Sequence, residues 1–426
     1  MTATPAHSEG SSAAVTGRTS YQWVLVILLS LNFGVVFFDR NALNFMMPFI
    51  QPELHLSNTM VGALAAALAL SWAVSGLFLG RISDLLGKRK VILVVCTVVF
   101  SCASLLSGIA VSFAFLLGAR LIMGMAEGGV LPISQTLIAA EVLPARRGLA
   151  MGVTQNFGAA LLGNFLGPVV VVAMATALGW RSACFLTAAP GLLMAALIGI
   201  FVFEPARAQI EQAAPRKRDM LREVFAHRNV IVCTIMSVLL VAFLMVFYSF
   251  MPLVLITVRG FDRSTMSWLM ATYGLSSIGY AVLVPGASDI VGRRPVTVIV
   301  AAISTILPLS ALFSSGPVWQ LFALFALGSV ISGIFPICMA TIPAETVPPR
   351  LIATVLGVTM GAAEIVGGVF GPMASGVIAD RFGLRATLWV LVTLTIAMAL
   401  LALALTETAP AARSARTRAS EAGVSA

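Results

Sequence analysis

The chain has 426 residues, of which 59% are hydrophobic and only 10% charged, and its mean hydropathy is +1.01. A soluble domain needs a polar surface, so this composition excludes a soluble fold. The formal net charge of +9 would suggest a nucleic-acid partner, but the cations lie in short loops beside apolar segments. We therefore predict a membrane protein that binds no nucleic acid.

The first twenty residues are polar, and we expect a disordered tail there. A membrane-spanning helix needs about 20 apolar residues, and the rest of the chain holds twelve such stretches. The sequence therefore predicts an all-α membrane protein with two six-helix bundles. The predicted helices span 22–47, 57–82, 91–112, 114–139, 147–173, 182–203, 229–257, 265–288, 295–314, 317–341, 351–377 and 386–406. The domains are a tail (1–21), a bundle (22–203), a linker (204–228), a second bundle (229–406) and a tail (407–426).

Lys and Arg concentrate in the tails and in the loops that follow even-numbered helices. Such cations mark the cytoplasmic side of a membrane protein. We expect a multi-pass protein of the inner (cytoplasmic) membrane, with both termini and the basic linker in the cytoplasm. The linker should lie against anionic headgroups of the lipid bilayer, and we expect the protein to be a monomer.

Four charged residues interrupt the apolar segments. Asp39 and Arg40 lie in the first predicted helix, and Arg120 and Glu127 lie in the fourth. A charge at membrane depth is costly unless it is paired or hydrated. With both acids ionised the four charges cancel, whereas protonation of both leaves +2, which attracts an anion. The pattern favours a pathway for protons and an anion, although an inert buried salt-bridge network would use the same residues.

The spacing of these residues decides where each side chain points. Arg120 and Glu127 are seven positions apart, so they share one helix face about 10 Å apart along the axis. Asp39 and Arg40 are consecutive and point about 100° apart. One of them can face the fourth helix while the other faces a central cavity. Asn44 follows Arg40 by one turn and shares its face.

The loops after the second and eighth predicted helices carry related motifs. Each places a carboxylate at a helix end, followed by a glycine turn and cations, so that ion pairs can form in one conformation and break in another. The motifs predict a gate, although the topology rule alone would also explain their cations. The motif residues are Gly80, Asp84, Gly87, Lys88 and Arg89 in the first loop, and Asp289, Gly292, Arg293 and Arg294 in the second.

The two halves of the chain repeat one another. Markers at the end of the fourth predicted helix recur 204 positions later at the end of the tenth. Such parallel repeats build transporters whose substrate site lies between the halves. The corresponding residues are Pro132, Glu141, Pro144 and Arg146 in the first half, and Pro336, Glu345, Pro348 and Arg350 in the second.

The first loop motif resembles the signature of the major facilitator superfamily, and the resemblance covers nearly the whole chain. Within it, the chain is similar to the anion:cation symporters, such as bacterial galactonate–proton and hexuronate transporters. That family carries an Asp-Arg pair in the first helix and an Arg, then Gly-x-x-Glu-Gly and Pro, in the fourth. The matching residues are Asp39, Arg40, Arg120, Gly124, Glu127, Gly128 and Pro132. The resemblance implies that Asp39 and Glu127 take up protons, that Arg40 binds the substrate anion, and that Arg120 serves coupling.

Further polar residues at membrane depth are candidates for contact with a substrate. Glu364, in the middle of the eleventh helix, could be a proton site or a substrate contact, or could face a neighbouring helix or water. Gln155 and Asn156 in the fifth helix, and Tyr248 and Ser249 in the seventh, could bind a hydroxylated substrate or join helices.

The leading hypothesis is proton-coupled import of a small organic anion, a sugar acid or related carboxylate, by alternating access. Gly163-x-x-x-Gly167-Pro168 resembles a pattern of drug-exporting antiporters and would equally serve helix packing, so export of organic anions or drugs is the alternative. A third hypothesis is a transporter-like sensor that signals through the linker. No nucleophile–base constellation or metal-ligand cluster is visible, so we predict no enzyme, no metal and no cofactor besides the coupled proton.

Overall fold

The computed structural model describes residues 9–204 and 217–409, and all regular secondary structure in these ranges is helical. Twelve helical runs in this part of the chain are long and apolar enough to cross a membrane, which confirms the predicted number. The first helix, predicted to end at 47, continues through Pro48 and Pro52 to Glu53. Prolines are tolerated in membrane helices because neighbouring groups satisfy the freed backbone.

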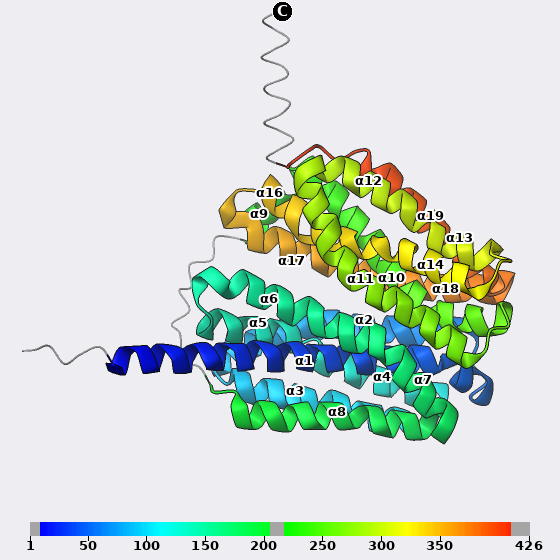
Figure 1. The fold of residues 1–426 in the computed structure, drawn as a ribbon, viewed down its shortest axis with the longest axis horizontal. Coiled ribbons are helices and arrows are strands. Elements are labelled where there is room, and N and C mark those ends of the chain that lie inside the picture. The colour runs from blue at the N-terminus through cyan, green and yellow to red at the C-terminus, as the bar shows by residue number, and fades with distance from the viewer. Residues whose placement is uncertain (1–8, 205–216, 410–426) are drawn as a thin grey trace, which may run out of the picture.

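Figure 1 shows the helices in two layers, with α1 to α8 in the lower layer and α10 to α19 in the upper one. Each layer is one repeat of the chain, as predicted. Shorter segments of tighter or wider turns, labelled η, interrupt several helices. The lower layer consists of α1 (Glu9–Glu53), α2 (Asn58–Leu86), α3 (Arg89–Gly108), α4 (Phe113–Glu127), α5 (Val130–Glu141), α6 (Pro144–Gly158), η1 (Ala159–Leu166), α7 (Gly167–Leu178) and α8 (Trp180–Phe201).

The upper layer follows a short linker helix, α9 (Lys217–Val224). Its tenth and eleventh membrane runs are broken most often, by η3 to η6. The elements are α10 (Arg228–Leu253), η2 (Val254–Val258), α11 (Arg263–Val291), α12 (Arg293–Ser304), α13 (Ile306–Phe313), α14 (Val318–Gly328), η3 (Ser329–Gly333), α15 (Ile334–Pro336), η4 (Ile337–Thr341), α16 (Ile342–Thr346), η5 (Pro349–Leu351), α17 (Ile352–Ala362), η6 (Ala363–Gly367), α18 (Gly368–Phe382) and α19 (Arg385–Ala402).

The predicted tail and linker contain more helix than expected. Residues 9–21 are helical instead of disordered, because α1 begins at Glu9. An established helix extends at low cost, since each added residue gains a hydrogen bond without a new nucleus. The linker likewise contains α9. The rest of the predicted tails and linker (1–8, 205–216 and 410–426) lies outside the described residues.

Three helices begin with a capping side chain at the same end of the bundle. Ser57 Oγ, Ser112 Oγ and Asp262 Oδ2 each accept a hydrogen bond from the backbone N–H three residues later, at 3.1, 3.3 and 3.1 Å. Each cap satisfies a donor that the helix leaves unpaired. We call this the capped end, and the opposite end, where α9 lies, the linker end.

The two layers make close helix contacts at the capped end and in the middle. A Cβ on Gly62 of α2 would lie 2.2 Å from the carbonyl oxygen of Pro372 in α18. A Cβ on Gly274 of α11 would lie 2.0 Å from the carbonyl oxygen of Asn164 in η1. Such approaches require glycine. The ribbons of the two layers converge toward this end in Figure 1 and diverge toward α9.

An acid of the upper layer caps a helix of the lower layer. Asp380 Oδ1 accepts a hydrogen bond from the backbone N–H of Asn58, at 2.8 Å. Its Oδ2 accepts from the backbone N–H and the Oγ1 of Thr59, at 2.9 and 2.6 Å. These bonds hold the end of α18 against the first turn of α2. Arg263 adds a second contact between layers, 4.2 Å from the centroid of the Phe49 ring.

Candidate functional site

All four charged residues predicted within the membrane are buried in the lower layer. Asp39 is 2% exposed, Arg40 5%, Arg120 3% and Glu127 0%. None of them forms an ion pair with a described residue. The inert salt-bridge network that the sequence also allowed is therefore not formed in this conformation.

Asp39 accepts its side-chain hydrogen bond from α3. Ser104 Oγ donates a hydrogen bond to Asp39 Oδ1, while Oδ2 is buried and has no partner among the described residues. The next residue, Arg40, forms a hydrogen bond with α4: its carbonyl oxygen accepts from Arg120 Nη1 at 3.1 Å. The free oxygen of Asp39 can carry a proton while the Ser104 bond is kept.

Glu127 lies at the end of α4, two turns beyond Arg120, as the spacing predicted. Both of its carboxylate oxygens are buried and without a hydrogen-bond partner in the described part of the chain. Gly124 and Gly128 flank it and allow α4 to pack closely on α2, with Gly124 O accepting a hydrogen bond from Ser75 Oγ at 3.2 Å. An unpaired buried carboxylate is costly, so the group is suited to proton uptake.

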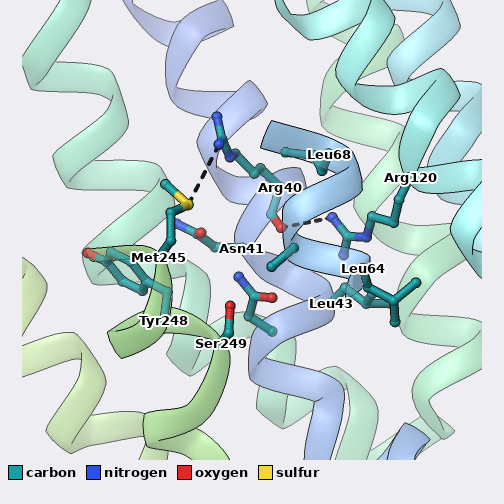
Figure 2. Close-up of a pocket in the computed structure, with 11 residues that line it drawn as sticks. Arg40, Asn41, Leu43, Leu64, Leu68, Arg120, Met245, Tyr248 and Ser249 are labelled. Carbon is teal, nitrogen blue, oxygen red and sulfur yellow. Dashed lines mark hydrogen bonds between the residues drawn. The ribbon is translucent and has the colours of Figure 1, made fainter. Parts of the chain in front are cut away.

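A cavity of about 20 Å³ lies between the two layers, and Figure 2 shows its lining. This volume holds roughly one water molecule, so the site is contracted in this conformation. Five predicted site residues come together here: Arg40, Asn44, Arg120, Tyr248 and Ser249. The other lining residues are Asn41, Leu43, Leu64, Ala65, Leu68 and Met245.

Arg40 reaches from α1 toward the upper layer, and Figure 2 shows it directed at Met245 of α10. Its Nη2 atom is 3.8 Å from the Met245 sulfur, and the guanidinium lies 5.5 and 5.8 Å from the ring centroids of Trp72 and Phe37. A guanidinium has five N–H donors. Contacts with a thioether and with aromatic rings satisfy these N–H donors only weakly, so the donors are suited to binding a carboxylate ligand.

Asn41 is a lining residue that sequence reasoning missed. Its Nδ2 donates to Asn164 Oδ1 in η1 at 3.2 Å. Asn164 in turn is the residue whose carbonyl oxygen faces Gly274 of the upper layer. In the sequence, the position of Asn164 between Gly163 and Gly167 was the only sign that this residue matters. The pair connects the cavity wall to a contact between the layers.

The remaining predicted substrate contacts do not line the cavity. Gln155 and Asn156 lie on α6, where Asn156 Nδ2 donates to Gly152 O at 3.0 Å. Glu364 lies in η6, and its Oε2 is buried without a partner among the described residues. Two hydroxyls near the site, Ser249 Oγ and Tyr273 OH, are also buried without a hydrogen-bond partner among the described residues.

The second gate motif forms a compact network within the upper layer. The buried guanidinium of Arg293 contacts Asp289 at 2.5 Å and Glu345 at 2.9 Å. Glu407 accepts hydrogen bonds from the backbone N–H groups of Arg293 and Arg294, at 2.8 and 3.1 Å. Partial burial opposes the ionised form of Glu407, but the backbone N–H groups of Ala409, Arg293, Arg294 and Thr408 outweigh it and hold its pKa below the ordinary value.

The first gate motif has contacts within the lower layer. Gly87 ends α2 with φ of +63°, a conformation that favours glycine. The backbone N–H groups of Arg89 and Lys90 donate to Glu204, at 2.6 and 3.0 Å. Lys88 precedes α3, a Cβ on Gly80 would lie 3.4 Å from Pro132 Cβ, and the Asp84 side chain lies outside the described residues. The pairing of the two motifs across the layers remains a prediction.

Comparison with known proteins decides the family. The family description of the Major Facilitator Superfamily matches residues 29–365, and again 260–426. The chain belongs to the Major Facilitator Superfamily. It is therefore a multi-pass membrane protein of the transporter type and not an enzyme, as the sequence predicted. In the described part of the chain, no group of three or more His, Cys, Asp or Glu has the arrangement of a metal site.

Relatives of known name share part of the chain. A probable sulfoacetate transporter of Cupriavidus necator is 29% identical over 184 residues, covering 43% of this chain and 42% of the relative. The hexuronate transporter of Bacillus subtilis is 29% identical over 269 residues, covering 60% of this chain and 63% of the relative. The chain thus matches less than two thirds of the length of either relative.

The fold is also that of solved transporters. A bacterial homologue of the human lysosomal transporter Spinster, in an inward-facing and unoccupied conformation, superimposes with a TM-score of 0.78. The sequences are 19% identical, and the match covers 90% of this chain and 97% of that one. This likeness confirms the predicted fold.

Proposed function

We propose that the protein imports a small organic anion, a sugar acid or related carboxylate, together with protons by alternating access. One observation carries the proposal. The Arg40 guanidinium lines the cavity between the layers, while two buried acids nearby, Asp39 and Glu127, have no cation partner. A guanidinium can bind a carboxylate through two parallel hydrogen bonds. The site accepts an anion once protons neutralise the acids.

The proposed cycle follows from the charges. Asp39 and Glu127 take up protons while the site is open to the outside, which leaves the charges of Arg40 and Arg120 uncompensated. A carboxylate then binds Arg40 and offsets the repulsion between the two arginines. After the layers rock, the acids lose their protons to the cytoplasm. Once ionised, the two acids lower the affinity of the site for the anion, so the protons and the cargo leave together.

The conformation is consistent with one stage of this cycle. If the linker end lies in the cytoplasm, as the Lys and Arg distribution predicts, the capped end faces outside. The contacts of α2 with α18 and of α11 with η1 then close the outer side. Opening there requires α2 to separate from α18 and to lose its hydrogen bonds to Asp380. The gate motifs would pair across the layers at the linker end in the alternate state.

The similar transporters support the class of cargo. The two relatives described above are named for hexuronate and sulfoacetate, both of which are small organic anions. The buried arginines agree with such cargo, since a positive site would repel cationic drugs.

Uptake by proteoliposomes under an inward proton gradient tests the proposal. Wild type should accumulate a sugar acid against its gradient, and collapse of the proton gradient should abolish accumulation. Asp39→Asn mimics the protonated acid, so it should still exchange cargo but fail to concentrate it. Asp262→Asn is a matched control, because Asn also caps helices. Accumulation by Asp39→Asn at the wild-type level would refute the assigned proton role.

Export of organic anions or drugs is the second candidate, and the glycine pattern of the fifth membrane run is the feature that suggests it. A Cβ on Gly163 would lie 2.5 Å from Phe37 Cβ in α1, and the equivalent Gly367 would meet the Val238 carbonyl oxygen of α10 at 2.3 Å. The pattern thus serves helix packing in both halves, which favours import. Everted vesicles separate the two: accumulation of cargo driven by a proton gradient directed out of the vesicles, from a lumen more acidic than the medium, would support export by antiport. A sensor would bind its ligand without flux.

A further inference from the structure

Glu364 is a third acid at membrane depth, and it belongs to the layer that does not carry the arginines. It lies in η6, whereas Arg40 lies in α1 and Arg120 in α4. Its Oε2 atom is buried without a hydrogen-bond partner in the described part of the chain. The transport cycle above makes no use of this acid. A buried acceptor without a partner requires an explanation.

The carboxylate of Glu364 lies where three helices meet. The position that a Cβ of Gly368 would occupy is 3.6 Å from Glu364 Oε2. The same position is 3.1 Å from the Ala69 Cβ of α2 and 3.7 Å from a Val241 methyl carbon of α10. The acid therefore borders the junction between the layers, next to α2 and α10.

Arg40 reaches the same junction from the lower layer. Its guanidinium contacts Trp72 of α2 and Met245 of α10. Trp72 is one helical turn from Ala69, and Met245 is one helical turn from Val241. One layer thus brings a guanidinium, and the other a carboxylate, to the junction that α2 and α10 form.

The charges at this place limit the cargo. With Asp39 and Glu127 protonated for binding and Glu364 ionised, the site holds two arginines and one carboxylate, a sum of +1. A cargo with one carboxylate neutralises the site. A second carboxylate would add an uncompensated negative charge beside Glu364, where little water screens it.

We propose that Glu364 selects hydroxylated monocarboxylates and rejects dicarboxylates. The cargo carboxylate binds Arg40, and a hydroxyl at the far end of the cargo donates a hydrogen bond to the Glu364 carboxylate. This inference rests on the proposed function, since it assigns the cargo of the same site. It differs from that function in giving the upper layer a role in choosing between acids.

Gluconate and glucarate are a matched pair of probes for this inference. They share one carboxylate and the same hydroxyl stereochemistry, and differ only at the far carbon, which carries a hydroxyl in gluconate and a carboxylate in glucarate. Their binding to purified wild type and Glu364→Gln should be measured by isothermal titration calorimetry at mildly acidic pH. Wild type should prefer gluconate. Glu364→Gln should reduce that preference at least about tenfold, mainly by gaining affinity for glucarate.

Two further variants separate charge from folding. Glu364→Asp keeps the charge and shortens the reach, so it should still reject glucarate while binding gluconate more weakly. Glu223→Gln makes the same chemical change in α9, at a residue that pairs with the exposed Arg350, and should leave the preference unchanged. Glu364→Gln removes a buried unpaired charge, so we expect its thermal stability to be no lower than that of wild type.

The outcomes separate this inference from the proposed function. Equal binding of the two probes by wild type, or an unchanged preference in Glu364→Gln, would overturn the role of Glu364 while leaving proton-driven uptake intact. Absence of binding of either acid to wild type, with no proton-driven uptake, would overturn the proposed function and this inference together.

Discussion

Arg120 donates a hydrogen bond from Nη1 to the main-chain carbonyl oxygen of Arg40, at 3.1 Å. The bond ties the guanidinium of α4 to the backbone of α1 at the residue whose own guanidinium lines the cavity. Both arginines border the cavity, and neither is neutralised by a carboxylate within ion-pair distance among the described residues. The arrangement holds two positive charges near each other, ready for an anion.

Replacement of Arg120 tests this arrangement. Arg120→Met removes one charge and the side-chain donor to the Arg40 carbonyl oxygen, so carboxylate affinity should fall at least about tenfold, or about 1.4 kcal/mol. Arg120→Lys keeps the charge but lacks the planar guanidinium, so its carboxylate affinity should lie between those of Arg120→Met and wild type. Calorimetric titration with gluconate checks both, with melting temperatures measured in parallel. Wild-type affinity in Arg120→Met would contradict a role in anion binding.

The close contact of α2 with α18 predicts sensitivity to a single methyl group. Gly62→Ala would place a Cβ 2.2 Å from the Pro372 carbonyl oxygen, so the layers must separate there. Overpacking of this kind costs roughly 1–3 kcal/mol. We expect a shift toward the state open at the capped end, measured as a longer distance between spin labels placed on the two layers. Gly118→Ala, where no atom lies within 4 Å, should show no shift.

Asp380 is predicted to act as a latch between the layers. Asp380→Ala removes the cap of α2 and should weaken closure of the capped end by about 1 kcal/mol. Asp262→Ala removes a cap of similar strength that lies within the upper layer. Both variants should melt at lower temperature, but only Asp380→Ala should lengthen the spin-label distance between layers. Identical distance distributions in the two variants would show that Asp380 only stabilises a helix end.

The hydrogen bonds of Glu407 predict that the protein loses some stability at the linker end when the pH falls. The pKa of Glu407 is lower in the folded protein than in the unfolded chain, because backbone N–H donors favour the ionised form despite partial burial. A depressed pKa stabilises the fold above the unfolded pKa, and this contribution is lost as pH falls through the folded pKa. The melting temperature should therefore fall between about pH 6 and about pH 3, and fall less steeply in Glu407→Gln. Parallel curves for Glu407→Gln and wild type would contradict this role, and Glu223→Gln serves as the control.

The sequence by itself determined the twelve membrane helices, the two related halves and the identity of the charged residues at the site. A charge such as Asp39 or Glu127 is conspicuous in an apolar run whatever its neighbours are, because its cost in the membrane does not depend on the tertiary fold. Helical spacing also placed Arg120 and Glu127 two turns apart. These properties depend on local composition and on the geometry of one helix.

Only the tertiary structure decided which partners these residues meet. Ser104 as the donor to Asp39, the pairing of Asn41 with Asn164, and the position of Gln155 outside the cavity depend on how each helix is rotated. A helix that is apolar on all sides has no polar face to indicate its rotation. That rotation is set by close contacts between small residues on different helices, such as Gly274 and the Asn164 backbone, which no single segment of the sequence contains.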